Sequence, residues 1–406
     1  MFVFDVFAAL LIWLGILSLR GGVRFLRYVQ TEIRANRANK NYAPFAAIVA
    51  PCRGLDENLS ENLSALLEQN YPAYEVIFVV DDERDASAHV IKEILAQNQT
   101  PNSRVKAKLI VAGKAVESSQ KVHNLRRAIM QISDDAEVLA FVDSDARAAG
   151  NWLSFLVAPL ADKKIGATTG YRWFVSKRGR TVSHLRAVWN ASIASALGAQ
   201  LEKNFCWGGA TAIRRETFEK LNMLEKWRGA ASDDFALTNA LQTANLPIYF
   251  VPQCLMAAIE DCTFTELLEF STRQMKITRV YAAHLWKAAF IGSFLFASIF
   301  WSGFLIVIYR ALEHQSFWLP LGLLLVIFAF GAAKAELRLR AVKLMLPQHK
   351  KHLDKSALWH LTLWTITPFL YFYNCLAAAF SRDIVWRGIA YELKSPTETI
   401  ITKFRE

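Results

Sequence analysis

Long apolar segments near both ends of the chain constrain its fold more than any other feature. Residues Phe4 to Leu19 are mostly apolar, and Leu285 to Ile308 form a second run of this kind. A helix of about 20 apolar residues crosses the hydrocarbon core of a bilayer. We therefore expect transmembrane helices at both ends. Two further candidate spans are Phe317 to Ala333 and Trp359 to Phe380, and Pro368 interrupts the second of them.

The N-terminal apolar run could also be a cleaved secretory signal. However, its basic residues follow the apolar segment instead of preceding it, and no cleavage site of small residues is evident. An uncleaved membrane anchor is the interpretation that these flanks favour.

The chain is strongly basic, with a formal net charge of +11. Many of its lysines and arginines lie beside apolar segments, between Arg20 and Lys40 and again between Arg338 and Lys355. Basic loops of this kind stay on the cytoplasmic side of a membrane. We therefore expect an integral, multi-pass membrane protein whose middle domain faces the cytoplasm. We expect no nucleic-acid partner, because the charge is explained by the membrane.

Between the apolar ends, strand-like segments alternate with helical ones. Four apolar runs are typical of buried strands: residues 45–51, 75–80, 105–113 and 137–142. Apolar side chains at helical spacing follow the first and third runs, over residues 59–67 and 118–132. This alternation predicts an α/β domain built on a mostly parallel sheet. The expected organisation is an N-terminal transmembrane anchor at 1–22, the α/β domain at 40–280, a C-terminal transmembrane region at 284–381 and an amphipathic, interfacial tail at 382–406.

Two of these strands end on pairs of carboxylates. Asp81 and Asp82 follow residues 75–80, and Asp143 and Asp145 follow residues 137–142. Open α/β sheets bind ligands at the carboxyl ends of their strands. Carboxylates gathered there repel each other unless a cation or hydrogen-bond donors are present.

A hard divalent ion, Mg²⁺ or Mn²⁺, suits such oxygen ligands and commonly bridges carboxylates to substrate phosphates. Alternatively, Asp143 and Asp145 only cap the next helix or form a turn. No Cys/His cluster indicates zinc, and no glycine-rich phosphate loop of the ATPase kind is present.

Eight segments, spread over most of the chain, carry a family resemblance. In order they are IVAPCRGLDENLSENL (48–63), VVDDERDAS (79–87), QKVHNL (120–125), VDSDARAAGNWL (142–153), GGATAIRRETFEKL (208–221), ASDDFAL (231–237), RQMKITR (273–279) and WRGIAYEL (386–393). In these segments and their order, the chain resembles the inverting, membrane-bound glycosyltransferases of families 2 and 21. Within these families it is similar to the ceramide glucosyltransferase branch. The resemblance implies a GT-A (nucleotide-diphospho-sugar transferase) fold with transmembrane helices at both ends.

On the donor side, the resemblance implies a nucleotide-sugar site with a divalent metal. Asp145 would be the main metal ligand, supported by Asp143 through the ribose or the metal. The remaining candidate residues for the nucleotide-sugar are Asp81, Asp82, Lys121, Asn124, Arg273, Lys276 and Arg279, the last three for the leaving diphosphate. Arg279 could equally be a membrane-facing charge.

On the acceptor side, Asp234 fills the position of the general base. Asp233 beside it would raise its proton affinity by like-charge repulsion. Alternatively, the two aspartates cap the helix that follows them. Cys206 and Trp207 would border the acceptor, although Trp207 could simply be packed in the core.

The chain departs from the family at one place. Where the family has Arg-Trp, this sequence has Lys276 and Ile277. Lysine keeps the charge but lacks the planar fork that binds phosphate in two places. The departure bears on the choice of acceptor more than on the reaction class.

The function that these features predict is transfer of a hexose, with glucose favoured, from a UDP-sugar to a membrane lipid. The acceptor would be the hydroxyl of a ceramide-like lipid, of diacylglycerol or of another lipid alcohol, and the reaction would invert the anomeric centre. The alternatives are a processive polysaccharide synthase, a polyprenyl-phosphate sugar synthase, and an inactive membrane scaffold that binds a nucleotide.

The C-terminal tail conflicts with a simple count of spans. An anchor and three later spans would place residues 386–393 outside, whereas their basic neighbours favour the inside. We therefore expect residues 359–380 to be bent or re-entrant, or the number of spans to differ. Trp386 and Tyr391 would then lie at the level of the headgroups.

Overall fold

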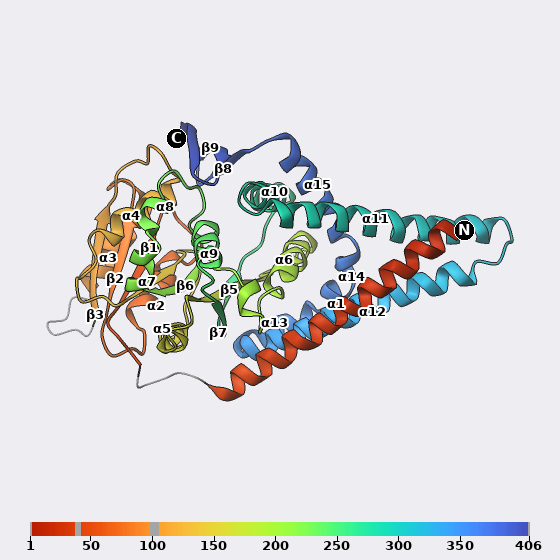
Figure 1. Ribbon diagram of the computed structural model, residues 1–406, viewed down its shortest axis with the longest axis horizontal. Coiled ribbons are helices and arrows are strands. Elements are labelled where there is room, and N and C mark those ends of the chain that lie inside the picture. The colour runs from red at the N-terminus through yellow and green to blue at the C-terminus, as the bar shows by residue number, and fades with distance from the viewer. Residues whose placement is uncertain (1, 37–41, 98–104, 405–406) are drawn as a thin grey trace. The chain divides into compact units, whose positions relative to one another are not determined.

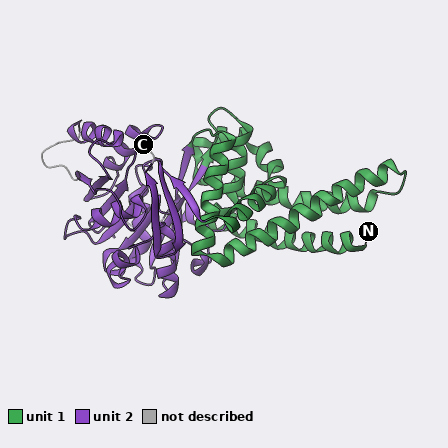
Figure 2. Ribbon diagram, turned by 90° about the horizontal axis from the view of Figure 1, so that it is seen from above, with its two compact units in different colours: residues 1–30, 174–195, 259–381 green, residues 31–173, 196–258, 382–406 purple. Residues whose placement is uncertain are grey.

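The computed structural model describes residues 2–36, 42–97 and 105–404. These residues form two compact units, which Figure 2 shows in different colours. We call residues 31–173, 196–258 and 382–406 the sheet unit. Residues 1–30, 174–195 and 259–381 form the helical unit.

The sheet unit is built on a seven-stranded sheet with the order β3-β2-β1-β4-β6-β5-β7 (Figure 1). Its strands are β1 (Ala46–Pro51), β2 (Tyr74–Val80), β3 (Val105–Val111), β4 (Val138–Val142), β5 (Ala167–Val175), β6 (Ala210–Arg214) and β7 (Ile248–Ile259). Strand β1 pairs parallel with β2 and β4, and β2 pairs parallel with β3. Strand β6 is antiparallel to β4 and to β5. The predicted α/β class with a mostly parallel sheet is confirmed.

The apolar runs of the sequence form the first four strands. Strands β1, β2 and β4 are buried almost throughout, whereas only Ile110 of the edge strand β3 is buried. Every residue of β2 and of β4 is buried, as expected for central strands of a sheet that is covered on both sides. Helix α2 (Leu59–Leu67) matches its prediction and ends ahead of Tyr71. Helix α4 (Gln120–Ile129) is shorter than predicted at both ends. It begins after Ser119, which caps its N-terminus by accepting from the Val122 N–H at 3.3 Å.

Shorter helices connect the strands of the sheet unit. They are α3 (Ala86–Gln97), α5 (Trp152–Val157), η1 (Ala158–Ala161), η2 (Leu201–Lys203), α7 (Arg215–Lys220), α8 (Met223–Lys226) and α9 (Asp233–Thr243). Helix α9 begins at two adjacent aspartates, Asp233 and Asp234.

The helical unit contains the long apolar helices. Its elements are α1 (Phe2–Ala35, whose last residues belong to the sheet unit), α6 (Thr181–Ala194), α10 (Phe264–Tyr281), α11 (Ala283–Leu312), α12 (Trp318–Met345), η3 (Pro347–His349), α13 (Lys350–Lys355), α14 (Ala357–Thr362), η4 (Leu363–Thr365) and α15 (Thr367–Phe380). By length and composition, three helices of the described chain could cross a membrane: α1, α11 and α12. A fourth candidate is the bent pair Ala357–Thr365 and Thr367–Phe380, with an angle of 55° between its halves. Phe4, Ala8 and Leu11 of α1 share an apolar cluster with side chains of α11 and α12.

The C-terminal tail differs from a simple amphipathic segment. It forms a three-stranded antiparallel sheet of β8 (Asp383–Trp386), β9 (Ile389–Ser395) and β10 (Glu398–Phe404). Ile389, Tyr391 and Leu393 are buried on one face of β9, whereas the residues between them are more exposed. This two-residue alternation is the pattern of a half-buried strand. The tail belongs to the sheet unit. Tyr391 is buried there and its hydroxyl accepts from the Gln120 N–H, so its predicted place among lipid headgroups is wrong, whereas contact of Trp386 with headgroups stays a prediction.

Gly170 offers a test of this packing. A Cβ at this position of β5 would lie less than 3.0 Å from the carbonyl oxygen of Cys254 on β7 and from the Cβ of Ala210 on β6. Because a strand carbonyl cannot move aside cheaply, Gly170→Ala should destabilise the sheet unit by about 1–3 kcal/mol. The measurement is thermal unfolding of the purified protein in detergent.

Gly150→Ala is the matched control, since a Cβ there would meet only the Glu68 carbonyl oxygen, at 4.0 Å. Equal unfolding temperatures for the two variants would contradict the tight packing of β5.

Candidate active site

The acidic residues predicted at the carboxyl edge of the sheet each have a basic partner. Strands β2 and β4 flank β1 in parallel, so the residues that follow them lie at one edge. The ion pairs are Asp81 with Arg53, Asp82 with Arg84 at 2.8 Å, Asp143 with Lys121 at 2.7 Å and Asp145 with Arg172 at 3.2 Å. The repulsion expected among these carboxylates is therefore offset by cations of the chain itself. The next helix, α5, has Asn151 at its N-cap position, so Asp143 and Asp145 do not occupy it.

Lys121 connects two of the predicted catalytic regions. Its ammonium lies 2.7 Å from Asp143 Oδ1 and 3.2 Å from Asp233 Oδ1. Burial alone would lower the pKa of Lys121, but the charges of Asp143, Asp233 and Asp234 raise it above its usual value. Lys121 is therefore a permanent cation. Gly208 permits this arrangement, because a Cβ there would lie within 3.0 Å of both the Asp233 carboxylate and the Lys121 ammonium.

The surroundings shift the pKa values of Asp143 and Asp233 in opposite directions. Burial would raise the pKa of Asp143, but Lys121 and Arg172 lower it below its usual value. Burial raises the pKa of Asp233 to about 6, against the opposing effect of Lys121 and with help from Asp234 and Asp143. The sequence-based interpretation had Asp233 raising the proton affinity of Asp234. The effect of Asp233 on the proton affinity of Asp234 stays a prediction.

Asp234 lies in the first turn of α9, where the N-terminus of the helix favours negative charge. Its Oδ1 accepts from the Phe235 N–H at 2.7 Å and from the Ser232 hydroxyl. Its Oδ2 lies 3.5 Å from the Gly208 N–H, a long contact that leaves this oxygen available. Ser232 is the N-cap residue of the helix. Asp234 therefore takes part in capping through Oδ1, whereas its Oδ2 has only the long contact with Gly208.

Asp145 is the residue that best fits a metal. Its Oδ1 is buried, and among the described residues this atom has no hydrogen-bond partner. Burial raises its pKa, Arg172 lowers it, and Asp143 raises it further, with a net increase. The described ranges contain no group of three His, Cys, Asp or Glu side chains that could hold a metal alone. Magnesium-like ions commonly use one or two carboxylates together with substrate phosphates, and Asp145 fits a metal bound in that way.

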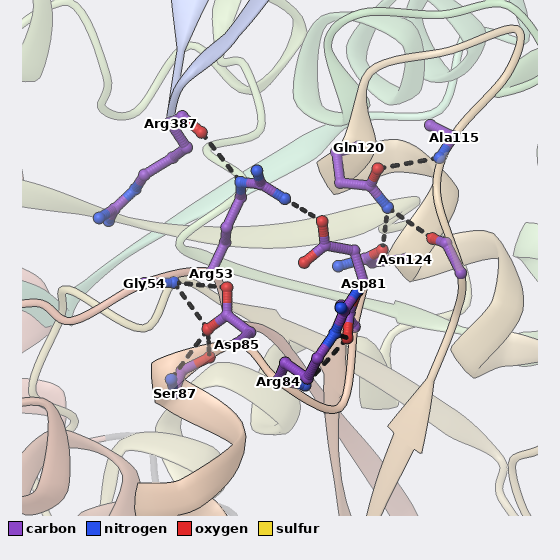
Figure 3. A network of polar contacts seen from close by, with 12 residues as sticks. Arg53, Gly54, Asp81, Arg84, Asp85, Ser87, Ala115, Gln120, Asn124 and Arg387 are labelled. Carbon is purple, nitrogen blue, oxygen red and sulfur yellow. Dashed lines mark hydrogen bonds and ion pairs between the residues drawn. The ribbon is translucent and has the colours of Figure 1, made fainter. Parts of the chain in front are cut away.

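Neighbouring side chains form hydrogen bonds and ion pairs with the residues that are predicted to bind the nucleotide (Figure 3). Asp81 is buried and binds Arg53, and its Oδ1 is another carboxylate oxygen that lacks a partner within the described part of the chain. Asn124 accepts from Gln120 Nε2 at 2.8 Å. Asp82 is more exposed, and hydrogen bonds from Arg84 lower its pKa below the usual range. Asp81 is thus better placed than Asp82 to define a binding site.

The predicted acceptor-side residues are buried by packing. The Cys206 N–H donates to Thr238 Oγ1 at 3.0 Å, and the Trp207 N–H donates to Thr169 Oγ1 at 3.0 Å. The Trp207 ring lies 5.4 Å from the Arg172 guanidinium. Trp207 therefore supports the partner of Asp145, in keeping with the core role considered for it.

The three basic residues predicted for the diphosphate lie on α10 of the helical unit. Lys276 Nζ donates to Ser381 Oγ at 3.2 Å. The guanidinium of Arg273 lies 5.8 Å from the Phe270 ring, and that of Arg279 lies 5.5 Å from the Trp286 ring. These partners belong to the same unit, and the contact of α10 with a diphosphate stays a prediction.

Sequence reasoning missed four residues of this site. They are Arg53, Asp56, Arg172 and Arg387. Arg387 Nη2 lies 2.6 Å from Asp56 Oδ1, and Asp56 Oδ2 accepts from Ser144 Oγ at 2.9 Å. Arg53, Asp56 and Arg387 fall within segments that carried the family resemblance, which was the signal available. Their pairing could not be read from the sequence, because the partners are far apart along the chain.

Comparison with protein families gives one match across nearly the whole chain. The family model of glycosyl transferase family 21 matches residues 10–399. Ceramide glucosyltransferase 1 of Caenorhabditis elegans is 21% identical over 207 residues, which are 49% of this chain and 42% of that protein. The chain therefore aligns with less than half the length of this relative.

Two solved structures illustrate a low level of structural likeness. The mannosyltransferase PcManGT from Pyrobaculum calidifontis, in complex with GDP-Man and Mn²⁺, has a TM-score of 0.48 at 16% identity, over 93% of this chain and 98% of that one. Glucosyl-3-phosphoglycerate synthase from Mycobacterium tuberculosis, in complex with Mn²⁺ and UDP-Glc, has a TM-score of 0.36 at 16% identity, over 61% of this chain and 81% of that one. Likeness at this level says nothing about the ligands of this chain.

The raised pKa of Asp233 predicts a pH dependence of stability. Its folded-state value of about 6 lies above the 3.8 of an ordinary aspartate. The protonated carboxyl of Asp233 therefore contributes stability to the folded state below about pH 4. This contribution is lost as the pH rises through 6. Relative to Asp233→Asn, the wild type should lose about 1–3 kcal/mol over this interval and little above it. Thermal unfolding of both proteins in detergent between pH 4 and 7.5 measures this difference. A difference that stays constant across the range would show that the carboxyl is not perturbed.

Proposed function

We propose, since the chain belongs to glycosyl transferase family 21, that it transfers a hexose from a UDP-sugar to the hydroxyl of a membrane lipid. Glucose is the favoured sugar, ceramide or a similar lipid alcohol is the favoured acceptor, and the anomeric centre is inverted. The predicted family resemblance is confirmed by this membership, and with it the GT-A fold and the class of glycosyltransferase. The observation that carries the proposal is the meeting of Asp143, Asp233 and Asp234 around Lys121, next to Asp145.

On the donor side, Asp81 and Asn124 would bind the nucleoside, and Asp145 with Asp143 would hold Mn²⁺ or Mg²⁺ against the donor diphosphate. The free Oδ1 of Asp145 supports this assignment. A metal bound there would supply charge stabilisation to the leaving diphosphate. Lys121 orients Asp143 and keeps it ionised. We assign Arg273, Lys276 and Arg279 to the diphosphate on the strength of the sequence resemblance.

On the acceptor side, Asp234 would act as the general base. In a single displacement, the acceptor oxygen bonds to the anomeric carbon while the bond from that carbon to the diphosphate oxygen breaks. The hydroxyl proton passes to Asp234, whose Oδ2 has only a long contact, with the Gly208 N–H. Attack from the face opposite the diphosphate inverts the anomeric centre. Asp233 is held by Lys121 and would fix the start of α9.

A transfer assay tests the proposed function. Purified protein in lipid receives radiolabelled UDP-glucose or UDP-galactose with Mn²⁺, Mg²⁺ or chelator, and a panel of ceramide, diacylglycerol, sterol and hopanoid-type lipids. A labelled, metal-dependent product that enters the organic phase is expected. A labelled polymer would favour a polysaccharide synthase instead, and UDP binding without any product would favour an inactive scaffold.

Substitution of single carboxylates separates their roles. Asp145→Ala should abolish turnover together with metal-dependent nucleotide binding. Asp234→Asn should reduce turnover by about 10²–10⁴-fold, as for loss of a general base, and spare nucleotide binding. The exposed Asp135 provides the control Asp135→Asn, which should leave both quantities unchanged. If Asp234→Asn kept most of its rate, the base would have to be another residue.

The tail also bears on membrane topology. Residues 382–404 form part of the sheet unit, so the chain must return to the side of that unit after residue 381. We propose that α11 and α12 cross the membrane, that the bent pair at 357–380 enters and leaves on one side, and that α1 is the third span. The sheet unit would then face the cytoplasm.

Cysteine labelling tests this arrangement, because the five native cysteines are all buried. A membrane-impermeant thiol reagent should label Gln315→Cys, between α11 and α12, in intact cells. It should label Lys394→Cys, on β9, only after the cells are permeabilised. Labelling of Lys394→Cys in intact cells would contradict the proposed topology.

A further inference from the structure

The turn between β8 and β9 places an arginine in an unusual backbone conformation. Trp386 pairs with Ile389, so Arg387 and Gly388 form a two-residue turn. Their φ values are 50° and 76°. Two-residue hairpin turns with positive φ at both positions usually have asparagine, aspartate or glycine first. A non-glycine residue with a long side chain there indicates that the side chain itself is needed.

The hairpin is fixed to the site by contacts that do not involve the Arg387 side chain. The Arg387 carbonyl oxygen accepts from Arg53 Nε at 2.9 Å (Figure 3). The Tyr391 hydroxyl accepts from the Gln120 N–H at 3.1 Å, at the start of the helix that carries Lys121. The Thr397 carbonyl packs so closely against Gly229 that a Cβ there would clash with it. These contacts of the tail therefore fix the backbone position from which the Arg387 side chain extends.

The guanidinium lies among the carboxylates of the candidate site. Its Nη2 is 2.6 Å from Asp56 Oδ1, and its side chain remains 37% exposed, so that a ligand can reach it. Burial alone would lower the pKa of Arg387, but the charges of Asp56, Asp145 and Asp143 raise it. Asp56 also accepts from Ser144, the residue between Asp143 and Asp145. Arg387 thus interacts electrostatically with Asp145, the proposed metal ligand, and none of the four strand-end carboxylates depends on it as its only ionic partner.

We propose that Arg387 is a ligand of the donor diphosphate, supplied by the C-terminal hairpin. This inference rests on the proposed function, since it concerns the same donor site. A guanidinium can bind two phosphate oxygens at once through its planar fork, which an ammonium cannot do. Arg387 would supply such a fork from the same unit that holds Asp143 and Asp145. Trp386 lies beside it, with its ring 5.9 Å from the Lys121 ammonium, and adds an aromatic surface to the same site.

The test compares binding of UDP and UMP to the full-length protein in detergent by calorimetry, with and without Mn²⁺. Asparagine tolerates positive φ, so Arg387→Asn should keep the turn and remove only the guanidinium. We expect this variant to bind UDP about 10- to 100-fold more weakly, the usual effect of losing a hydrogen bond to a charged group. UMP binding should be unchanged, because UMP lacks the second phosphate. The UDP affinity of Arg387→Lys should lie between the affinities of Arg387→Asn and of the wild type.

Arg382→Asn is the matched control, since Arg382 lies in the same tail and donates to the Lys394 carbonyl at 2.7 Å. It should bind UDP as the wild type does. Arg387→Gly, which also suits the turn, replaces the asparagine variant if that protein does not fold.

Two results would overturn the role of Arg387 and leave the proposed function intact. In the first, Arg387→Asn binds UDP as tightly as the wild type. In the second, UDP and UMP binding fall equally, which would mean that Arg387 only holds the hairpin in place. A wild-type protein with no affinity for UDP would overturn the proposed function and this inference together.

Discussion

The pair of contacts that Lys121 makes with Asp143 and Asp233 is the interaction on which the candidate site depends. The three residues come from α4, from the end of β4 and from the start of α9. Removing one partner from a buried group of charges leaves the others uncompensated, at a cost of about 3–5 kcal/mol. Without Lys121, the buried carboxylate of Asp233 and the partly buried one of Asp143 would repel each other next to Asp234. The ion pairs also require a glycine at position 208, because any side chain there would occupy their space.

Two other carboxylates at this edge of the sheet are also paired with cations from other segments of the chain: Asp81 with Arg53, and Asp145 with Arg172. Buried carboxylate oxygens that still lack a hydrogen-bond partner therefore indicate where a ligand could bind. Within the described residues, Asp81 Oδ1 and Asp145 Oδ1 are buried carboxylate oxygens that have no partner. These atoms lie where a nucleoside and a diphosphate-bound metal are proposed to bind. The tail completes the edge, since its hairpin binds Arg53, Gln120 and Asp56. The tail thus contacts residues of the candidate site, and residues 386–393 are also one of the segments that carry the family resemblance.

Much of this arrangement could be predicted from the sequence, because it depends on local patterns. Apolar runs predicted β1 to β4, and the acidic residues that follow two of them predicted the edge at which Asp81 and Asp143 lie. Other features depend on contacts between distant segments. Strand β6 is antiparallel, and no local pattern marks its direction. Arg172 lies within a strand and pairs with Asp145 only after the sheet forms. The raised pKa falls on Asp233 and is caused first by its burial, which depends on packing and not on the adjacent charge alone.

A double-mutant cycle between Lys121 and Asp233 tests the central claim most directly. Thermal unfolding in detergent at pH 7.5 would compare Lys121→Met, Asp233→Asn and the double variant with the wild type. If Lys121 neutralises Asp233, Lys121→Met alone should be strongly destabilised, and adding Asp233→Asn should restore part of the loss, because one uncompensated buried charge is removed. Losses that simply add would mean that the two side chains act independently, and the account of the site built around Lys121 would be wrong.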